Sequence, residues 1–565
     1  WQAGRGYSWF HGWLAGRLSV CGVEPIWNYL QELETDEFPY NTCYLRYTVH
    51  GDNGPPDELM PDVIRAWNER YDSPQFRITT TKEFFTAFEE QYGEYLPTYG
   101  GDMTPTWEDG ASSTARETAM NRESAARLTR TEILWSMLSP ESDYPARELA
   151  EAWKNVLLFS EHTWGASASG PDPYSQFTKD LWAGKKMYAD SADVQSRRLC
   201  DEAMAGITAG EGYVQVLNTN LWPRTDVVTV AADLTGKPSG EPVAVQRLHD
   251  GGWIFLAEEV PALSSSVYRI VPAASSAKAK KSPAAPASMI IGGNVLDNGL
   301  VRVAVDPAKG TIRSLKAAGA DYEYAAGEGL NDYIYSGRIA ADPRGIDRVT
   351  RVEVLDDGPV AATLRIVSDA PGCNALWRDV TVYRGLGRVD IRNTVDKQDI
   401  LEHESVRFVF PFNFAHPEIT MDLAMSEMHP EREQLAGVNK HYYSLLNGMA
   451  VGDLEHAVCL TTLDAPFVEL GTPSGEDYRL NPRHGYGWWP SAQISPVVYS
   501  WVMNNTWRTN YKASQGGVAS FRYSLQICDP FDLKLKQRGA EREQPLIAVE
   551  SGRAEPVGRL FRLEG

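Results

Sequence analysis

The sequence lacks the spacings that mark a self-contained metal site. Its histidines form no HxH, HExxH or other closely paired motif. Its cysteines are far apart and form no CxxC pair, so we expect buried or free thiols rather than a zinc knuckle or a disulfide framework. The six cysteines are Cys21, Cys43, Cys200, Cys373, Cys459 and Cys528.

The chain also lacks long apolar runs and a positive charge balance. No uninterrupted apolar run is long enough to cross a bilayer. The net charge is −21, from 54 basic and 75 acidic residues. Nucleic acid and anionic membranes both require cationic surface, so neither is an expected partner, whereas a neutral sugar fits.

The chain begins at Trp1 and has no basic segment followed by an apolar one at its start. If the native N-terminus lies further upstream, that absence has no bearing on export. The cysteine usage favours a cytoplasmic location.

The 565 residues exceed what one hydrophobic core usually serves, so we expect three or four domains. In residues 1–93, predicted strands at 44–49 and 77–80 alternate with predicted helices at 59–71 and 82–92. Such alternation indicates an α/β unit with a parallel sheet. The segment is too short to close a barrel, so we interpret it as the end of a larger domain.

Residues 94–208 are predicted to form three helices with short links, which favours a three-helix bundle. The first helix should start near Thr114, which forms a capping-box pattern with Glu117. The second should run from about 145 to 162, and the third from about 174 to 204.

From residue 209 the apolar period changes to two. Residues 209–272 are predicted to form a small β domain, with Val214, Val216, Val228 and Val230 alternating with polar residues. Residues 273–288, rich in Ala, Lys, Ser and Pro, should form a linker. Residues 289–565 are predicted to form a large β-sandwich, in which Val301, Val303 and Val305 share one face of a strand. The predicted fold class is therefore multidomain α+β.

Asp52 lies in a Gly/Pro-rich loop after a predicted strand, where α/β sheets place ligands. A carboxyl group there can act as a general acid if its pKa is raised. An Asp beside Asn and Gly also forms turns by bonding its own backbone, and local sequence favours the turn.

His162 lies at the predicted end of a helix, directly after Glu161. An imidazole there can bind zinc, and Glu161 could orient it or contact a ligand. A lone histidine at the negative end of a helix is more often structural, so the local pattern favours that role.

Tryptophan is abundant, with 17 residues, and aromatic residues mix with amides at 488–489 and 501–507. Flat rings and amides suit sugars, which present C–H faces and hydroxyl edges. A β-sandwich core accounts for the same pattern equally well.

Several stretches, in the same order, resemble bacterial members of glycoside hydrolase family 38, the α-mannosidases. The most specific is Glu161-His162-Thr163-Trp164-Gly165, which is similar to the family's zinc-histidine segment at the end of a middle-domain helix. The other similar stretches are residues 51–58, 67–71, 79–85, 96–102, 107–110, 114–122, 218–224, 296–300, 410–412 and 501–512. The resemblance covers nearly the whole chain.

The resemblance implies a retaining exo-α-mannosidase that uses zinc held by two His and two Asp, one of which is the nucleophile. By position, His162 would be a zinc ligand and Asp52 the acid/base residue. Asn53, Glu161 and Trp164 would bind substrate, a mannose-containing glycan or a small mannoside. Residues 1–93 would be the end of a seven-stranded, barrel-like catalytic domain.

This sequence also departs from the family pattern. The family's N-terminal His-x-Asp pair has no counterpart, and Glu24 and Glu32 have the wrong contexts for the nucleophile. Thr163 stands where many members have a sugar-binding Asp. We therefore expect three of the four zinc ligands to lie upstream of Trp1, and the chain alone neither to bind zinc tightly nor to turn over substrate.

Three alternatives remain open at this stage. One is a non-catalytic carbohydrate-binding protein that uses the tryptophans of the sandwich. The others are a hydrolase of another sugar and a polysaccharide lyase, for which His484 with Tyr486 is the only tempting pair. A large β-sandwich also leaves surface for a homo-oligomer.

Overall fold

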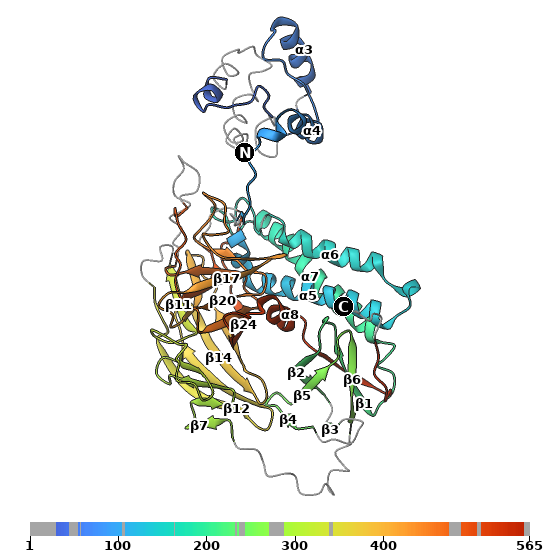
Figure 1. The fold of residues 1–565 in the computed structure, drawn as a ribbon, viewed down its shortest axis with the longest axis vertical. Helices are drawn as coiled ribbons and strands as arrows, with labels where there is room; N and C mark the ends of the chain where they lie inside the picture. The colour runs from blue at the N-terminus through green and yellow to red at the C-terminus, as the bar shows by residue number, and fades with distance from the viewer. Residues whose placement is uncertain are drawn as a thin grey trace. The chain divides into compact units, whose positions relative to one another are not determined.

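The computed structural model describes residues 30–44, 55–56, 58–103, 108–162, 164–231, 234–236, 243–270, 288–337, 343–473, 488–505 and 510–558. The chain divides into two compact units, Trp1–Tyr99 and Gly100–Gly565. Its main architecture is a mixed α/β arrangement with few helices and many antiparallel strands (Figure 1).

The described part of the first unit is helical. Helix α3 spans Met60–Arg70 and α4 spans Thr81–Tyr92, followed by the short 3-10 helix η2 at Gly93–Tyr95. Both predicted helices are confirmed to within about one residue. Thr80 and Glu83 form a full capping box, in which the Thr80 side chain accepts from the Glu83 backbone N–H.

The predicted strand at 77–80 is wrong, because these residues form no strand and lead directly into the capped start of α4. An extended segment becomes a strand only when a neighbour completes its hydrogen bonds. Residues 45–49 of the other predicted strand lie outside the described residues.

Three long helices follow in the second unit: α5 at Ala115–Leu138, α6 at Ala146–Ser160 and α7 at Gln176–Met204. They lie alongside one another (Figure 1). Leu128 of α5, Leu149 and Val156 of α6, and Ala192 and Leu199 of α7 share one apolar cluster. The helix positions agree with those expected from the 3.6-residue period.

The predicted capping box at Thr114 and Glu117 is wrong. No capping hydrogen bond from the Thr114 side chain forms at the start of α5, which follows the 3-10 helix η3 (Glu108–Thr114). Instead, the Ala115 N–H donates to the Gln515 side chain at 3.0 Å. A residue 400 positions away therefore satisfies the first backbone donor of α5.

The rest of the described chain is mostly antiparallel sheet, ordered β12-β13-β14-β15-β24-β21-β20-β17-β18, β11-β16-β23-β22-β19, β10-β9-β8-β7, β25-β1-β6-β3 and β2-β5-β4. The strand bounds are β1 Tyr213–Asn218, β2 Arg224–Val230, β3 Leu234–Gly236, β4 Val245–Arg247, β5 Trp253–Val260, β6 Ser264–Ile270, β7 Ile290–Ile291, β8 Val295–Asp297, β9 Val301–Val305, β10 Ile312–Ala317, β11 Asp332–Gly337, β12 Arg348–Asp357, β13 Ala361–Asp369, β14 Cys373–Tyr383, β15 Arg388–Lys397, β16 Glu404–Pro411, β17 Glu418–Leu423, β18 Ser426–Met428, β19 Tyr443–Ser444, β20 Gly448–Gly452, β21 Ala457–Thr462, β22 Phe467–Leu470, β23 Val497–Asn504, β24 Gly517–Cys528 and β25 Ile547–Ser551. A short helix, α8 at Leu535–Glu543, precedes the last strand.

The sheets after residue 288 share one large apolar core, to which the nine-stranded and five-stranded sheets both contribute. Val301, Val303 and Val305 of β9 are buried in it, as predicted. The expected linker lies almost entirely in residues 271–287, outside the described residues.

The chain's last described strand departs from the expected domain boundary. Strand β25 pairs with β1, although residues 289–565 were all predicted to belong to the large β region. Leu546, just before β25, packs with Val214 and Val216 in the core of the small sheets. The last described strand therefore belongs to the sheet that contains β1, β6 and β3.

A buried ionic network ties the small sheets to the large β region. Asp226 of β2 binds Arg224 and Arg388, each at 2.9 Å, and Arg388 also binds Asp390 at 3.0 Å. Burial alone would raise the pKa of Asp226, but the positive charges of the arginines outweigh it and lower the pKa to about 2.

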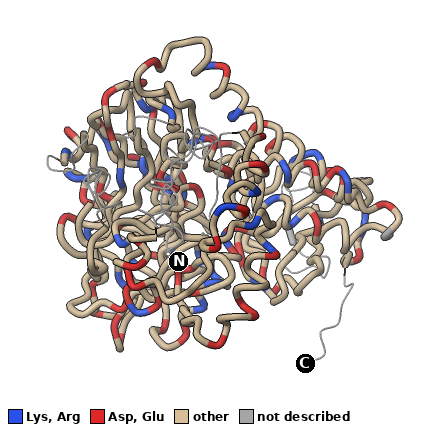
Figure 2. Tube along the Cα trace, turned by 90° about the horizontal axis from the view of Figure 1, so that it is seen from above, with Lys and Arg blue, Asp and Glu red and all other residues tan. Residues whose placement is uncertain are grey.

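Acidic and basic residues are interspersed along the trace (Figure 2). Among the described residues, no helix combines the length and apolarity needed to cross a membrane. Cys200, Cys373, Cys459 and Cys528 are buried free thiols.

Candidate active site

His162 lies just after the end of α6, as its sequence context predicted. Helix α6 ends at Ser160, and Glu161 turns the chain into an extended conformation while its N–H still donates to the Leu157 carbonyl at 2.9 Å. Both Glu161 and His162 are exposed. The C-terminus of α6 therefore presents an imidazole and a carboxylate side by side at the surface of the second unit.

Lys185 of α7 anchors this helix end. Its ammonium group donates to the carbonyls of Leu158 at 2.9 Å and Glu161 at 2.8 Å, and to the Glu161 carboxylate at 2.7 Å. The Lys185 side chain is only 8% exposed. Burial lowers the pKa of Lys185, while the hydrogen bond and the charge of Glu161 oppose that change. A cation at the C-terminus of α6 is also favoured by the helix dipole.

Trp164 and Gly165, which follow in the segment after His162, pack closely against Tyr511. Trp164 is 7% exposed and meets the Tyr511 ring edge to face, with centroids 6.0 Å apart. A Cβ on Gly165 would lie 2.5 Å from the Tyr511 backbone carbon, so only glycine permits this approach. With so little exposed area, the Trp164 ring offers limited surface to a sugar, and its role in substrate binding stays a prediction.

The same Tyr511 binds a fully buried carboxylate, that of Asp109. It accepts hydrogen bonds from the hydroxyls of Tyr511 at 3.1 Å and Tyr442 at 3.3 Å, and from the Asn504 amide at 3.4 Å. These partners come from segments 333 to 402 residues away. Asp109 thus connects the start of the helical segment to the large β region through Tyr511, whose ring also contacts Trp164.

Further aromatic residues surround His441, the neighbour of Tyr442 in the chain. The His441 ring stacks on Trp489 with centroids 4.1 Å apart and also contacts Trp488. Burial lowers the pKa of His441 to about 4, so its ring is neutral at physiological pH. Trp488 and Trp489 are half-buried, whereas Trp501 is 2% exposed and belongs to the core.

Of the expected site residues, Asp52 and Asn53 lie outside the described residues. The same is true of Thr163, Trp507, His484, Tyr486 and the rejected Glu24. The structure therefore brings together Glu161, His162 and Trp164 of the predicted set. The sequence reasoning missed Lys185, Asp109, Tyr442 and Tyr511. Asp109 was visible only as part of the family-like stretch 107–110, and Lys185 had no signal beyond its place in an amphipathic helix.

Among the described residues, no three His, Cys, Asp or Glu side chains come close enough together to hold a metal ion. His162 is one candidate ligand, but the adjacent Glu161 carboxylate is bound to Lys185. One imidazole does not make a tetrahedral zinc site, so the described residues alone do not fit a bound zinc ion.

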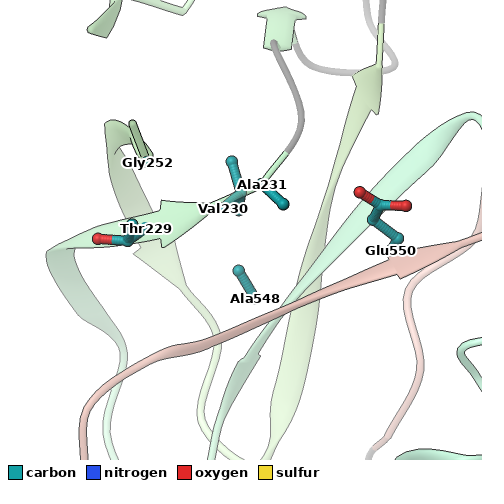
Figure 3. A pocket seen from close by; sticks show the side chains of 6 residues that line it. All are labelled: Thr229, Val230, Ala231, Gly252, Ala548 and Glu550. Carbon is teal, nitrogen blue, oxygen red and sulfur yellow. The ribbon is translucent and has the colours of Figure 1, made fainter. Parts of the chain in front are cut away.

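A separate hollow of about 530 Å³ lies in the small β sheets, lined by Thr229, Val230, Ala231, Gly252, Ala548 and Glu550 (Figure 3). Its lining is mostly apolar, and Glu550 is the one charged residue among these six. It contains none of the candidate site residues and brings no acid/base pair together.

Comparison with known proteins provides independent information about this region. Residues 105–199 match the family model described as the alpha mannosidase middle domain. The matched segment contains Asp109, Glu161, His162, Trp164 and Lys185.

Two curated relatives are similar over part of their length. The chain is 27% identical over 272 residues to alpha-mannosidase 2C1 of Mus musculus, and 26% identical over 279 residues to alpha-mannosidase 2C1 of Homo sapiens. Each alignment covers 46% of this chain and 23% of the relative. The chain therefore matches about a quarter of the length of these proteins.

Solved structures resemble the fold over nearly the whole chain. An alpha-mannosidase from Enterococcus faecalis V583 aligns with a TM-score of 0.70 at 14% identity, covering 95% of this chain and 69% of that one. A protein in glycosyl hydrolase family 38 from Enterococcus faecalis aligns with a TM-score of 0.66 at the same identity and coverage. At this identity, the likeness is one of fold.

Proposed function

We propose that the protein hydrolyses terminal α-mannosides, because this chain belongs with the α-mannosidases of glycoside hydrolase family 38. One observation carries the proposal: the exposed His162, at the anchored end of α6, falls inside the segment that matches the α-mannosidase middle domain. The substrate would be a mannose-containing glycan or a small mannoside.

The finer mechanism is part of the same proposal. His162 would supply one zinc ligand, and zinc would act as a Lewis acid that grips sugar hydroxyls. The other ligands would come from beyond the described residues. Asp52 would be the acid/base carboxyl of a retaining double displacement, which requires a second carboxylate as nucleophile.

The described residues would act mainly by holding His162 in position. Lys185 holds Glu161 and the end of α6, which sets the direction in which His162 leaves the helix. Trp164, Gly165 and Tyr511 would form a rigid wall behind the imidazole. Asn53 would bind substrate beside Asp52, and the expected seven-stranded barrel-like domain, three-helix bundle and large β-sandwich would be the family architecture.

The test measures zinc content and hydrolysis of a chromogenic α-mannoside together. Both are assayed on this chain and on a longer version that includes the upstream reading frame. We expect about one zinc per chain and hydrolysis in a version that holds all four ligands, and His162→Ala should abolish both. His416→Ala, which changes an exposed histidine after β16, is the matched control and should retain both.

The outcomes separate the candidate functions. If His162→Ala leaves zinc and hydrolysis intact, the assignment of His162 is wrong. If no version binds zinc or cleaves the substrate but mannosides still bind, the protein is a carbohydrate-binding relative of the hydrolases.

A further inference from the structure

Two cysteines on neighbouring strands of the nine-stranded sheet lie in direct contact. Cys459 belongs to β21 and Cys528 is the last residue of β24. In the register of these strands, Cys459 is opposite Gln526 and Ala457 is opposite Cys528. The two cysteines are thus diagonal neighbours, and their sulfur atoms are 3.0 Å apart as free thiols.

The thiol pair lies in a small apolar cluster beneath α8. Cys459 is 1% exposed and Cys528 is 9% exposed. They pack with Ala450, Ala457 and Leu535, the first residue of α8. Such surroundings hold the two sulfurs at fixed positions and admit only small uncharged reagents.

The two thiols are not equivalent. The hydrogen bond from the Cys459 thiol lowers the pKa of Cys528, burial opposes this, and the charge of Arg538 lowers it further. Arg538 is held in place because its Nε donates to the Leu533 carbonyl at 2.9 Å. The hydrogen bond with Cys528 raises the pKa of Cys459. Cys528 is therefore the more readily ionised sulfur, and Cys459 keeps its proton.

We propose that Cys459 and Cys528 form a reversible oxidation site at which hydrogen peroxide converts the two thiols into a disulfide. The Cys528 thiolate attacks one peroxide oxygen, the O–O bond breaks, and the departing hydroxide is protonated to water, leaving a sulfenic acid. The Cys459 sulfur then attacks the sulfenic sulfur, loses its proton, and displaces a second water. Two thiols lose two electrons and one peroxide becomes two waters.

Little rearrangement is needed, because the sulfurs move only about 1 Å closer to reach the disulfide bond length. The new bond would join β21 to β24 across 69 residues of sequence, directly under the start of α8. The inference is independent of the proposed hydrolase function, since neither cysteine contacts Glu161, His162 or Asp109 in the described structure.

The experiment exposes the reduced full chain to a small molar excess of hydrogen peroxide at neutral pH without denaturant. Remaining thiols are then blocked with iodoacetamide before mass spectrometry. We expect the treated chain to carry two fewer carbamidomethyl groups than the untreated chain blocked in the same way, and to yield a cross-linked peptide that contains Cys459 and Cys528. Dithiothreitol should restore both thiols.

Two variants make the result specific. Cys459→Ala removes the resolving thiol, so Cys528 should accumulate as a sulfenic acid, which dimedone traps once the treated chain is unfolded. Cys373→Ala is the control: Cys373 is also buried but bonds the Tyr333 hydroxyl at 3.3 Å, and its loss should leave the disulfide unchanged. The proposal is overturned if both thiols survive in the folded chain, if they are oxidised no faster than Cys373, or if the cross-link forms only in urea.

Discussion

Replacing Lys185 by Met should loosen the end of α6 that carries His162. Methionine keeps a long unbranched side chain in the same space but removes all three hydrogen bonds to the Leu158 and Glu161 carbonyls and the Glu161 carboxylate. The two carbonyls belong to the last turn of the helix, which has no partners of its own for them.

The magnitude follows from opposing contributions. Hydrogen bonds to charged groups contribute about 1.5–3 kcal/mol, and a cation at a helix C-terminus adds about 0.3–1 kcal/mol. Desolvation of the ammonium group, which lowers the pKa of Lys185, cancels much of this gain. Since Glu161 is half exposed and can regain water, we expect a net loss of about 1–2 kcal/mol of local stability.

Hydrogen exchange by mass spectrometry measures this loss on a peptide spanning residues 157–162. A loss of this size should make its amides exchange roughly 5 to 30 times faster, because exchange through local opening follows the opening free energy. Lys186→Met is the matched control, since among the described residues Lys186 pairs only with Asp190 of the same helix, at 2.6 Å. Unchanged exchange in Lys185→Met, or an equal increase in the control, would refute the anchoring role.

Other predictions concern the rest of the second unit. The pKa of Asp226, about 2 in the folded chain against a usual 3.8, means that its stabilisation is complete above about pH 5 and is lost as the pH falls through 2. In urea titrations over this pH range, the free energy of unfolding of the wild type should fall by roughly 2 kcal/mol more than that of Asp226→Asn. Equal losses in the two proteins would contradict the ion-pair account. Gly165→Ala should lower stability by about 1–3 kcal/mol because its Cβ meets the Tyr511 backbone. Gly184→Ala, in open space within α7, should raise stability by about 0.5–1 kcal/mol. Thermal unfolding measures both effects, and unfolding temperatures of the two variants that shift in the same direction would argue against the close approach at Gly165.

Local patterns predict most of the secondary structure. The 3.6-residue period, a proline near one start and a glycine beyond one end are enough to place α5, α6 and α7 within a few residues. Period-two alternation identifies the buried face of β9, where Val301, Val303 and Val305 are all buried as expected. These predictions succeed because each depends only on residues a few positions apart.

Patterns of this kind fail where a distant partner decides the outcome. Thr114 and Glu117 have the capping-box spacing, yet Gln515 takes the first donor of α5. The segment at 77–80 has strand-like composition, yet it forms no strand. Strand β25 pairs with β1, more than 300 residues earlier, rather than with the large sheets next to it in sequence.

For the candidate site, the sequence by itself determines that His162 and Glu161 follow a helix and that Trp164 and Gly165 come next. Only the tertiary structure decides that Lys185 binds Glu161, that Trp164 is buried, and that Asp109 joins Tyr442 and Tyr511. The physical reason is that the periods of helices and strands depend only on residues a few positions apart in the sequence. A buried hydrogen bond, in contrast, depends on which donor and acceptor the folded chain brings within about 3 Å.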